Sequence, residues 1–278
     1  MRRRGLFAAL LAGALLVVQP AAAEVCRFAG TTSYAGQIAV VTEASLAGGL
    51  LTLDVTASLT ASTPWFSDLQ YRTQEISIWR GGVLQSLAVN TRYGLDGTIK
   101  RQQWDVYTLR AGRLEARRVQ AKTLPDFQRR HPAFARHWAP AAFGLPWLQD
   151  YGAAAPERRP DLDLASMPAG LRPPLAFAFY WSRFLAQGGQ AVPVFLPGFK
   201  RDARADVPVG AAMAGEGWQR WPVALRHPGL GAAPSTAAAW VSNDGRLLQL
   251  AFDVQGRLGA ARGLIRAQGC QGFPVRDD

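Results

Sequence analysis

Two carboxylates on alternating segments are the first residues in this sequence that could do chemistry. Glu75 falls on the face of residues 69–79 that also carries Trp79, and Asp105 falls on the face of a later segment that carries Tyr107. Paired carboxyl groups about 5–9 Å apart can act as general acid and base. If the two segments are strands of one sheet, Glu75 and Asp105 are candidate catalytic residues. Pairing of Glu75 with an arginine such as Arg101 is the non-catalytic alternative.

The histidines offer a second set of candidates. His131 and His137 are six residues apart in the chain, which on a helix separates them by about 240° and is poor geometry for a shared metal. In an irregular loop the two rings could still converge for a metal or catalytic role, and a surface role is the alternative. We expect neither a metal nor a cofactor.

Familiar catalytic motifs are missing from the sequence. It contains no Gly-x-Ser-x-Gly elbow, no glycine-rich phosphate loop before a lysine and no dinucleotide fingerprint. These absences do not decide whether the protein is an enzyme, and they favour a non-enzymatic role.

The two cysteines lie near opposite ends of the chain, at Cys26 and Cys270. In an oxidising compartment an even pair of cysteines favours a disulfide. A metal pair or two free thiols are the alternatives. A disulfide would make the first and last strands neighbours in space.

The N-terminal segment predicts export. Residues 1–23 comprise a basic start at Arg2–Arg4, an apolar run at Leu6–Val18 and small residues at Ala21–Ala23. This order is typical of a signal peptide with cleavage near Ala23. A transmembrane anchor is the alternative, but the apolar run is too short to cross about 30 Å of hydrocarbon as a helix. We therefore expect a periplasmic or secreted protein without a transmembrane segment in the mature chain.

The formal net charge of the chain is +11, and most of its cations are arginines. Such a surface could meet anionic lipid, lipopolysaccharide or an acidic protein partner, although solvated arginines are the simpler explanation. No nucleic-acid-binding motif is present, and nucleic acid is not an expected partner. The arginines and lysines form four local clusters: Lys100–Arg101, Arg117–Arg118, Arg129–Arg130 and Arg158–Arg159.

The elements that would position these residues are mostly strands joined by tight turns. Alternating and β-branched segments predict a curved antiparallel sheet or half-barrel, so the fold class is mainly β (α+β), with residues 24–278 as a single domain. The strands are expected at Thr31–Val41, Leu50–Leu59, Leu69–Trp79, Val83–Tyr93, Ile99–Leu109, Leu114–Gln120, Ala191–Leu196, Ala238–Ser242, Arg246–Val254 and Arg257–Ile265.

Two segments interrupt the strands. Residues 121–174 are rich in proline and aromatic residues, which predicts an ordered insertion of short turns and loops. Leu175–Gln187 follows two prolines and stops before two glycines, and its composition predicts one buried helix.

Large aromatic rings are numerous for a domain of this size. They could line an apolar ligand groove, or they could form an ordinary core between the sheet and the helix. The candidate ligand-binding residues are Trp79, Trp104, Tyr107, Trp138 and Trp181.

Turn patterns recur at Trp79–Leu84, Gly94–Gly97, Phe195–Arg201 and Trp240–Leu247. They resemble an uncharacterised family of exported bacterial domains of unknown function, and the resemblance extends loosely over residues 30–265. The layout of that family is similar to the lipoprotein-carrier (LolA/LolB-like) half-barrel. The resemblance implies a curved sheet closed by helices and a periplasmic location, and it brings no catalytic residue.

Three functions are compatible with these observations. The first is binding of a hydrophobic or amphipathic envelope ligand, such as a lipid, in the curved sheet. The second is an envelope hydrolase that uses carboxylates on the sheet face. The third is a protein-interaction module that uses the aromatic insertion to dock a protein partner.

Overall fold

The computed structural model describes residues 22–33, 35–63, 66–96, 98–110, 113–118, 172–181, 191–195, 204–225, 234–256, 259–272 and 275. Most of the predicted signal peptide and of the insertion at 121–174 lies outside these residues. His131, His137 and Trp138 lie outside them as well. The predictions made for those segments and residues therefore stay predictions.

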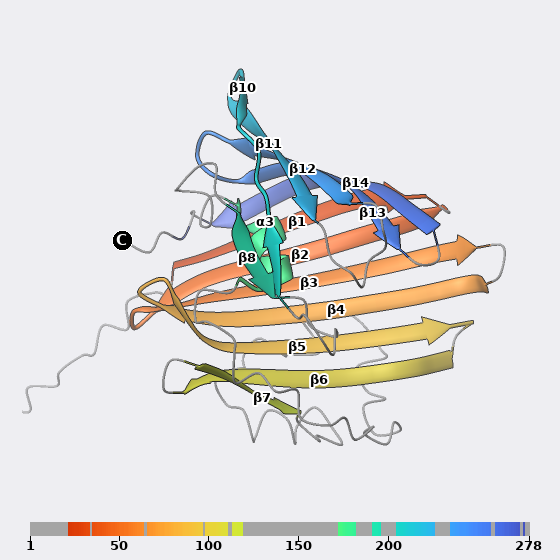
Figure 1. The fold of residues 1–278 in the computed structure, drawn as a ribbon, viewed down its shortest axis with the longest axis horizontal. Coiled ribbons are helices and arrows are strands. Elements are labelled where there is room, and N and C mark those ends of the chain that lie inside the picture. The colour runs from red at the N-terminus through yellow and green to blue at the C-terminus, as the bar shows by residue number, and fades with distance from the viewer. Residues whose placement is uncertain are drawn as a thin grey trace, which may run out of the picture.

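A twelve-stranded antiparallel sheet dominates the structure, in the order β10-β11-β12-β13-β14-β1-β2-β3-β4-β5-β6-β7 (Figure 1). The sheet is curved and not closed, because β7 and β10 stand at opposite ends of this order. The first seven strands are β1 (Ala22–Thr32), β2 (Gly36–Ala47), β3 (Leu50–Thr63), β4 (Phe66–Arg80), β5 (Val83–Leu95), β6 (Thr98–Arg110) and β7 (Arg113–Arg118). The remaining strands of the sheet are β10 (Met213–Gly215), β11 (Trp218–Leu225), β12 (Ser235–Ser242), β13 (Leu247–Gly256) and β14 (Gly259–Gly272).

Tight turns connect consecutive antiparallel strands, as the sequence predicts. The β2–β3 and β4–β5 connections are the glycine pairs Gly48–Gly49 and Gly81–Gly82, and all four residues have positive φ, which glycine adopts without strain. The expected curved antiparallel sheet is therefore confirmed.

One predicted strand is wrong. Residues 31–41 do not form a single strand, because the chain turns between Thr32 at the end of β1 and Gly36 at the start of β2. Ala35 has a φ of 51° in this turn, and the Ser33 N–H donates to the Arg262 carbonyl at 2.8 Å. The β-branched composition on both sides of the turn concealed it.

A small layer covers one face of the sheet. It consists of the helix α3 (Pro174–Phe179) and a two-stranded sheet of β8 (Val192–Phe195) and β9 (Arg204–Val207), of which α3 and β8 are labelled in Figure 1. The helix contacts β3, β4 and β8, and β9 contacts β11. We call α3, β8 and β9 the covering layer and the face beneath it the concave face.

The predicted helix at 175–187 is interrupted at Tyr180, and Trp181 is helical again. The helix α3 comes before this interruption. It spans six residues and ends at Phe179, because Tyr180 has φ −120° and ψ 48°, outside the helical region. Residues 182–187, the end of the predicted helix, lie outside the described part of the chain. No helix among the described residues is long and apolar enough to cross a membrane.

The core lies between the concave face and the covering layer. Two clusters of buried apolar side chains meet there, and α3 contributes to both. On the sheet side they include Phe28, Val40, Val55, Leu53, Leu87, Leu250 and Ile265, and the covering layer adds Ala176, Phe177, Phe179, Val194 and Val207. The hydrophobic effect therefore holds the covering layer on the sheet.

Candidate functional site

A buried carboxylate joins the concave face to the covering layer. Glu75 lies in the middle of β4, and only 1% of its surface is exposed. Its Oε1 accepts a hydrogen bond from the backbone N–H of Ala176 at 2.6 Å, and its Oε2 accepts one from the N–H of Leu175 at 3.2 Å. Glu75 thus links β4 to the start of α3, about 100 positions later in the chain.

The helix needs this carboxylate because it has no cap of its own. The first N–H groups of a helix lack partners within the helix, and a preceding Ser, Thr, Asp or Asn commonly supplies an acceptor. Here the N-cap residue is Pro173, and its side chain makes no capping hydrogen bond. Glu75 from the sheet takes that place, and its charge suits the positive end of a helix.

Burial dominates the electrostatics of Glu75. Removal from water raises the pKa of Glu75 from its ordinary 4.5 to about 7, although the two backbone N–H donors act in the opposite direction. The carboxyl therefore changes charge near neutral pH, at the contact between the sheet and the helix.

Glu75 and Asp105 occupy one row across the sheet. Glu75 on β4 pairs with Val89 on β5, and Val89 pairs with Asp105 on β6. The backbone register therefore places Glu75 and Asp105 on one face, as the sequence predicts. Two strand spacings separate their backbones by about 10 Å. The side chain of Asp105 is outside the described part. The hydrogen bonds described for Glu75 go to α3 rather than to Arg101.

Trp79 lies on the same face, two rows further along β4, after Ser77. Its indole N–H donates to the Ser77 hydroxyl at 2.9 Å, and 3% of its surface is exposed. The Arg172 guanidinium, which precedes α3, lies 5.2 Å from the centre of its ring. This is cation–π geometry, so the chain entering α3 is held at Trp79 as well as at Glu75.

Trp181 follows α3 and is buried with 2% exposure. Its ring centre lies 4.7 Å from that of Phe177, while the Phe179 ring centre lies 5.2 Å from that of Phe28 on β1. Within the described structure the Trp181 indole N–H has no hydrogen-bond partner. A buried donor without a partner costs about 1–3 kcal/mol. The hydroxyls of Ser45 and Thr56 on the sheet are also buried without a partner among the described residues.

The other predicted aromatic residues do not all join this site. Tyr107 is buried at 1% exposure, and its row on the sheet is that of Leu87 on the concave face. Trp104 pairs with Asn90 and therefore occupies a register position on the opposite face. A strand alternates its faces, so Trp104 and Tyr107, three residues apart, cannot share one.

Sequence reasoning missed a buried polar cluster on that opposite face. Asp54 on β3 is 5% exposed, and the Gln74 side-chain amide donates to both of its oxygens, at 3.1 and 2.9 Å. Burial raises the pKa of Asp54 well above its usual value, and the bond from Gln74 acts against this. Alternation around Leu53 and Val55 could have shown that Asp54 faces away from the concave side.

The opposite face also carries a shallow, open groove over β14, β1, β2 and β3. Its volume is about 600 Å³, and none of the predicted aromatic residues lines it. Small, polar and aliphatic residues line it instead, among them Ala29, Ile38, Ser58, Thr60, Leu264 and Arg266. The predicted aromatic groove is therefore not this one.

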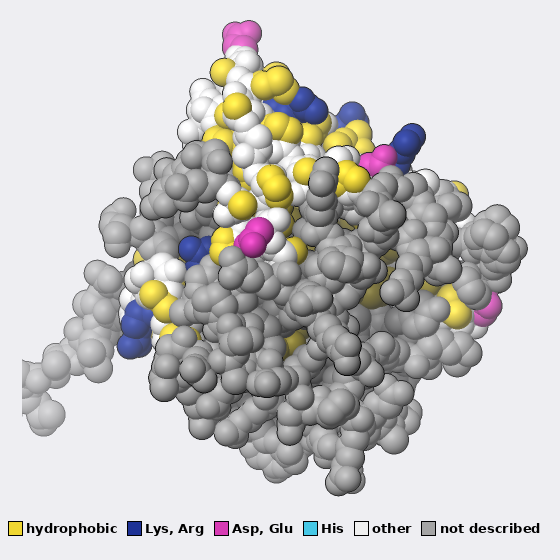
Figure 2. Space-filling view, in the orientation of Figure 1, with side chains coloured by type: hydrophobic (Ala, Val, Ile, Leu, Met, Phe, Trp, Pro, Cys, Tyr) yellow, Lys and Arg dark blue, Asp and Glu magenta, His cyan; other side chains and the backbone are white. Residues whose placement is uncertain are grey.

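Charged side chains are scattered on the side of the molecule drawn in Figure 2. Hydrophobic side chains gather over its upper part, where β10–β12 lie. Met213 on β10 is one of the exposed apolar residues, at 49% exposure. The side chains of the arginine and lysine clusters predicted from the sequence are outside the described part.

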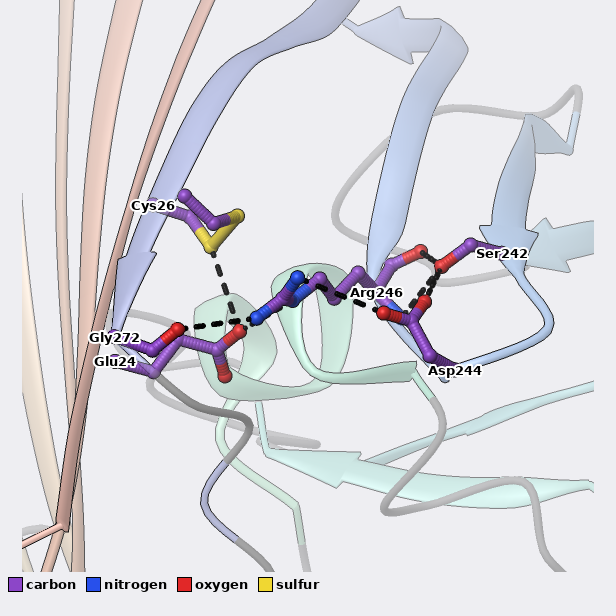
Figure 3. The surroundings of a disulfide bond; sticks show 7 residues. Glu24, Cys26, Ser242, Asp244, Arg246 and Gly272 are labelled. Atoms are coloured by element: carbon purple, nitrogen blue, oxygen red, sulfur yellow. Dashed lines mark hydrogen bonds and ion pairs between the residues drawn. A yellow bond between two sulfur atoms is a disulfide. The ribbon is translucent and has the colours of Figure 1, made fainter.

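The predicted disulfide is confirmed. Cys26 on β1 and Cys270 on β14 are bonded and face each other in register, which joins residues 244 positions apart (Figure 3). Beside the bond, Arg246 at the β12–β13 turn donates to Glu24 at 2.8 Å and to the Gly272 carbonyl at 3.3 Å. Disulfides persist in oxidising compartments, which indicates an extracytoplasmic protein.

Comparison with known proteins supports the fold and no activity. No protein-family model and no curated protein matches the sequence. Among solved structures, the chain is similar to a β-barrel-like protein of the domain of unknown function DUF1849 from Brucella abortus, with 11% identity over 91% of this chain and 99% of that chain and a TM-score of 0.55.

A DUF1329 family protein from Desulfovibrio piger aligns over 94% of this chain and 90% of its own, with 8% identity and a TM-score of 0.21, which is too low to show a shared fold. At 11% identity, the likeness to the DUF1849 protein shows the fold alone. It agrees with the predicted resemblance to uncharacterised domains with a half-barrel layout.

Proposed function

We propose that this chain is an exported, non-enzymatic protein that binds a hydrophobic or amphipathic ligand of the bacterial envelope on the concave face of its sheet. The covering layer occupies the ligand's place in the structure described here and moves aside when the ligand binds. The disulfide supports the periplasmic location, because such bonds persist where thiols are oxidised.

The observation that carries the proposal is the apolar concave face beneath a small, separate layer. Side chains of the large sheet form two apolar clusters, and the opposing side chains come from α3, which contributes to both clusters, and from β8 and β9. Apolar surface removed from water contributes about 25 cal/mol per Å². An acyl chain on the same surface would replace the contacts that α3 makes.

Two further features support a movable layer. The helix is only six residues long, and a single side chain of the sheet, Glu75, caps its start. Among the described residues, the Trp181 N–H has no partner while the layer is closed, so the closed arrangement leaves this buried polar group unsatisfied.

The hydrolase alternative gains no support from the described residues. The hydrogen bonds described for Glu75 go to backbone N–H groups, and none of them links it to a histidine or to a second carboxylate, as catalysis by an acid–base pair requires.

Lipid extraction tests the proposal. The protein is purified from bacterial envelope without detergent, extracted with organic solvent and analysed by mass spectrometry. Two matched variants place the same bulky ring on opposite faces. Ala57→Trp fills the concave face, where Ala57 packs against the core, and Ala39→Trp adds the ring to the exposed opposite face.

We expect a co-purifying amphiphile at a defined ratio with the wild-type protein and with Ala39→Trp, and little with Ala57→Trp. Protein that carries no amphiphile, or equal loading of both variants, would contradict binding on the concave face.

A further inference from the structure

The concave face contains a carboxylate whose hydrogen-bond partners belong to the covering layer. Both oxygens of Glu75 are satisfied by backbone N–H groups of α3, at 2.6 and 3.2 Å, and the residue is 1% exposed. Its neighbours in the row across the sheet are apolar, Val55 on β3 and Val89 on β5. The sheet residues beside Glu75 in that row therefore offer it no donor in place of α3.

Removal of α3 by a ligand would leave this acceptor unsatisfied unless the ligand supplies donors. A buried polar group that loses its partner keeps its desolvation cost and gains nothing in return, and the cost is larger for charged groups. A ligand group that only accepts hydrogen bonds leaves that cost in full, and an anionic head adds repulsion. A ligand with N–H groups at that point restores both bonds.

We propose that Glu75 selects the ligand, and that the protein binds amphiphiles whose polar head carries N–H donors, such as a primary amide or an amine. This inference rests on the proposed function, because it concerns the same concave face. The apolar surface alone does not determine the head group of the ligand, and Glu75 adds that requirement. The helix α3 already shows the required chemistry, since it presents two adjacent N–H groups at its start and apolar side chains beyond them.

Three probes with the same chain length isolate the head group: decanamide, methyl decanoate and decanoate. Decanamide carries N–H donors, methyl decanoate only accepts hydrogen bonds, and decanoate is anionic. Binding is measured by isothermal titration calorimetry on the disulfide-bonded protein at pH 8.

We expect wild-type protein to bind decanamide about tenfold or more tightly than methyl decanoate, and decanoate most weakly. A Glu75→Gln variant offers both a donor and an acceptor, so we expect it to bind decanamide and methyl decanoate within about threefold of each other. Glu216→Gln, which removes an equal charge from an exposed turn, is the matched control and should keep the wild-type preference. Circular dichroism and thermal unfolding confirm that each variant is folded.

The outcomes separate the two proposals. If wild-type protein binds none of the probes, the proposed function is contradicted together with this inference. If it binds all three within about threefold, or if Glu75→Gln keeps the preference for decanamide, the concave face still binds amphiphiles but Glu75 does not select them, and the inference alone is overturned.

Discussion

Replacement of Glu75 by glutamine should remove a large pH dependence of stability. The carboxyl is buried under α3, and burial raises the pKa of Glu75 from 4.5 to about 7. A pKa unit corresponds to 1.36 kcal/mol, so the neutral form is favoured in the folded state by about 3 kcal/mol.

The sign follows from the direction of this pKa change. A carboxyl whose pKa is higher in the folded than in the unfolded state binds its proton more tightly when folded. Its contribution to stability is complete below pH 4.5 and is lost as the pH rises to about 7. Above that pH the folded protein holds a buried charge, and the full cost of about 3 kcal/mol applies.

Glutamine has nearly the same shape and does not titrate. We therefore expect the free energy of unfolding of wild-type protein minus that of Glu75→Gln to fall by about 3 kcal/mol between pH 4 and pH 8. Urea unfolding of both proteins at several pH values measures this difference. Contributions of groups that do not interact with Glu75 cancel. The Glu75 charge is one of the smaller causes that raise the pKa of Asp54, so that part of the Asp54 titration belongs to the measured difference.

Two results would refute this reasoning. A difference that stays constant within about 1 kcal/mol from pH 4 to pH 8 would mean that Glu75 is not desolvated as its burial implies. A difference that rises with pH would mean that the N–H groups of Leu175 and Ala176 stabilise the ionised form more than burial opposes it.

Three other substitutions test the frame around the site. Cys26→Ser removes a disulfide between residues 244 positions apart and should lower the free energy of unfolding by about 5 kcal/mol, measured by urea unfolding without reductant; a loss under about 1 kcal/mol would contradict this. Gly30→Ala should lower the melting temperature far more than a typical surface substitution, because the added Cβ would overlap the backbone carbonyl of Leu264 on β14, and an unchanged melting temperature would show that the strands are not so close. Ser77→Ala removes the acceptor of the Trp79 indole N–H and should cost about 1–3 kcal/mol in the same assay, whereas a neutral effect would mean that this hydrogen bond does not stabilise the fold.

Local signals in the sequence were enough to predict most of the sheet. Glycine pairs at the turns and alternation along β4 and β5 are properties of short segments, so they can be read without the fold. The disulfide was predictable for another reason, since two cysteines allow only one intramolecular pair. The turn after Thr32 was missed because no glycine pair or Asx-Gly signal marks it.

The role of Glu75 depends on a contact that no local pattern contains. Alternation places it on the face of Trp79, but its partners Leu175 and Ala176 lie about a hundred positions away. The sequence around Pro173 predicts a helix start without a capping side chain. The missing hydrogen-bond acceptor was the one sign in the sequence that a distant residue, such as Glu75, caps this helix. Asp54 differs, because its place between Leu53 and Val55 already assigns it to the other face.

Hydrogen–deuterium exchange of residues 172–181 tests most directly whether the covering layer gives way to a ligand on the concave face. The N–H groups of Leu175 and Ala176 are protected by Glu75 in the closed arrangement. On addition of whichever ten-carbon probe binds most tightly, we expect exchange in this segment to increase, while β3 and β4 stay protected. Unchanged or slower exchange in residues 172–181 at saturating probe would contradict the account, because the ligand would then bind without moving the layer.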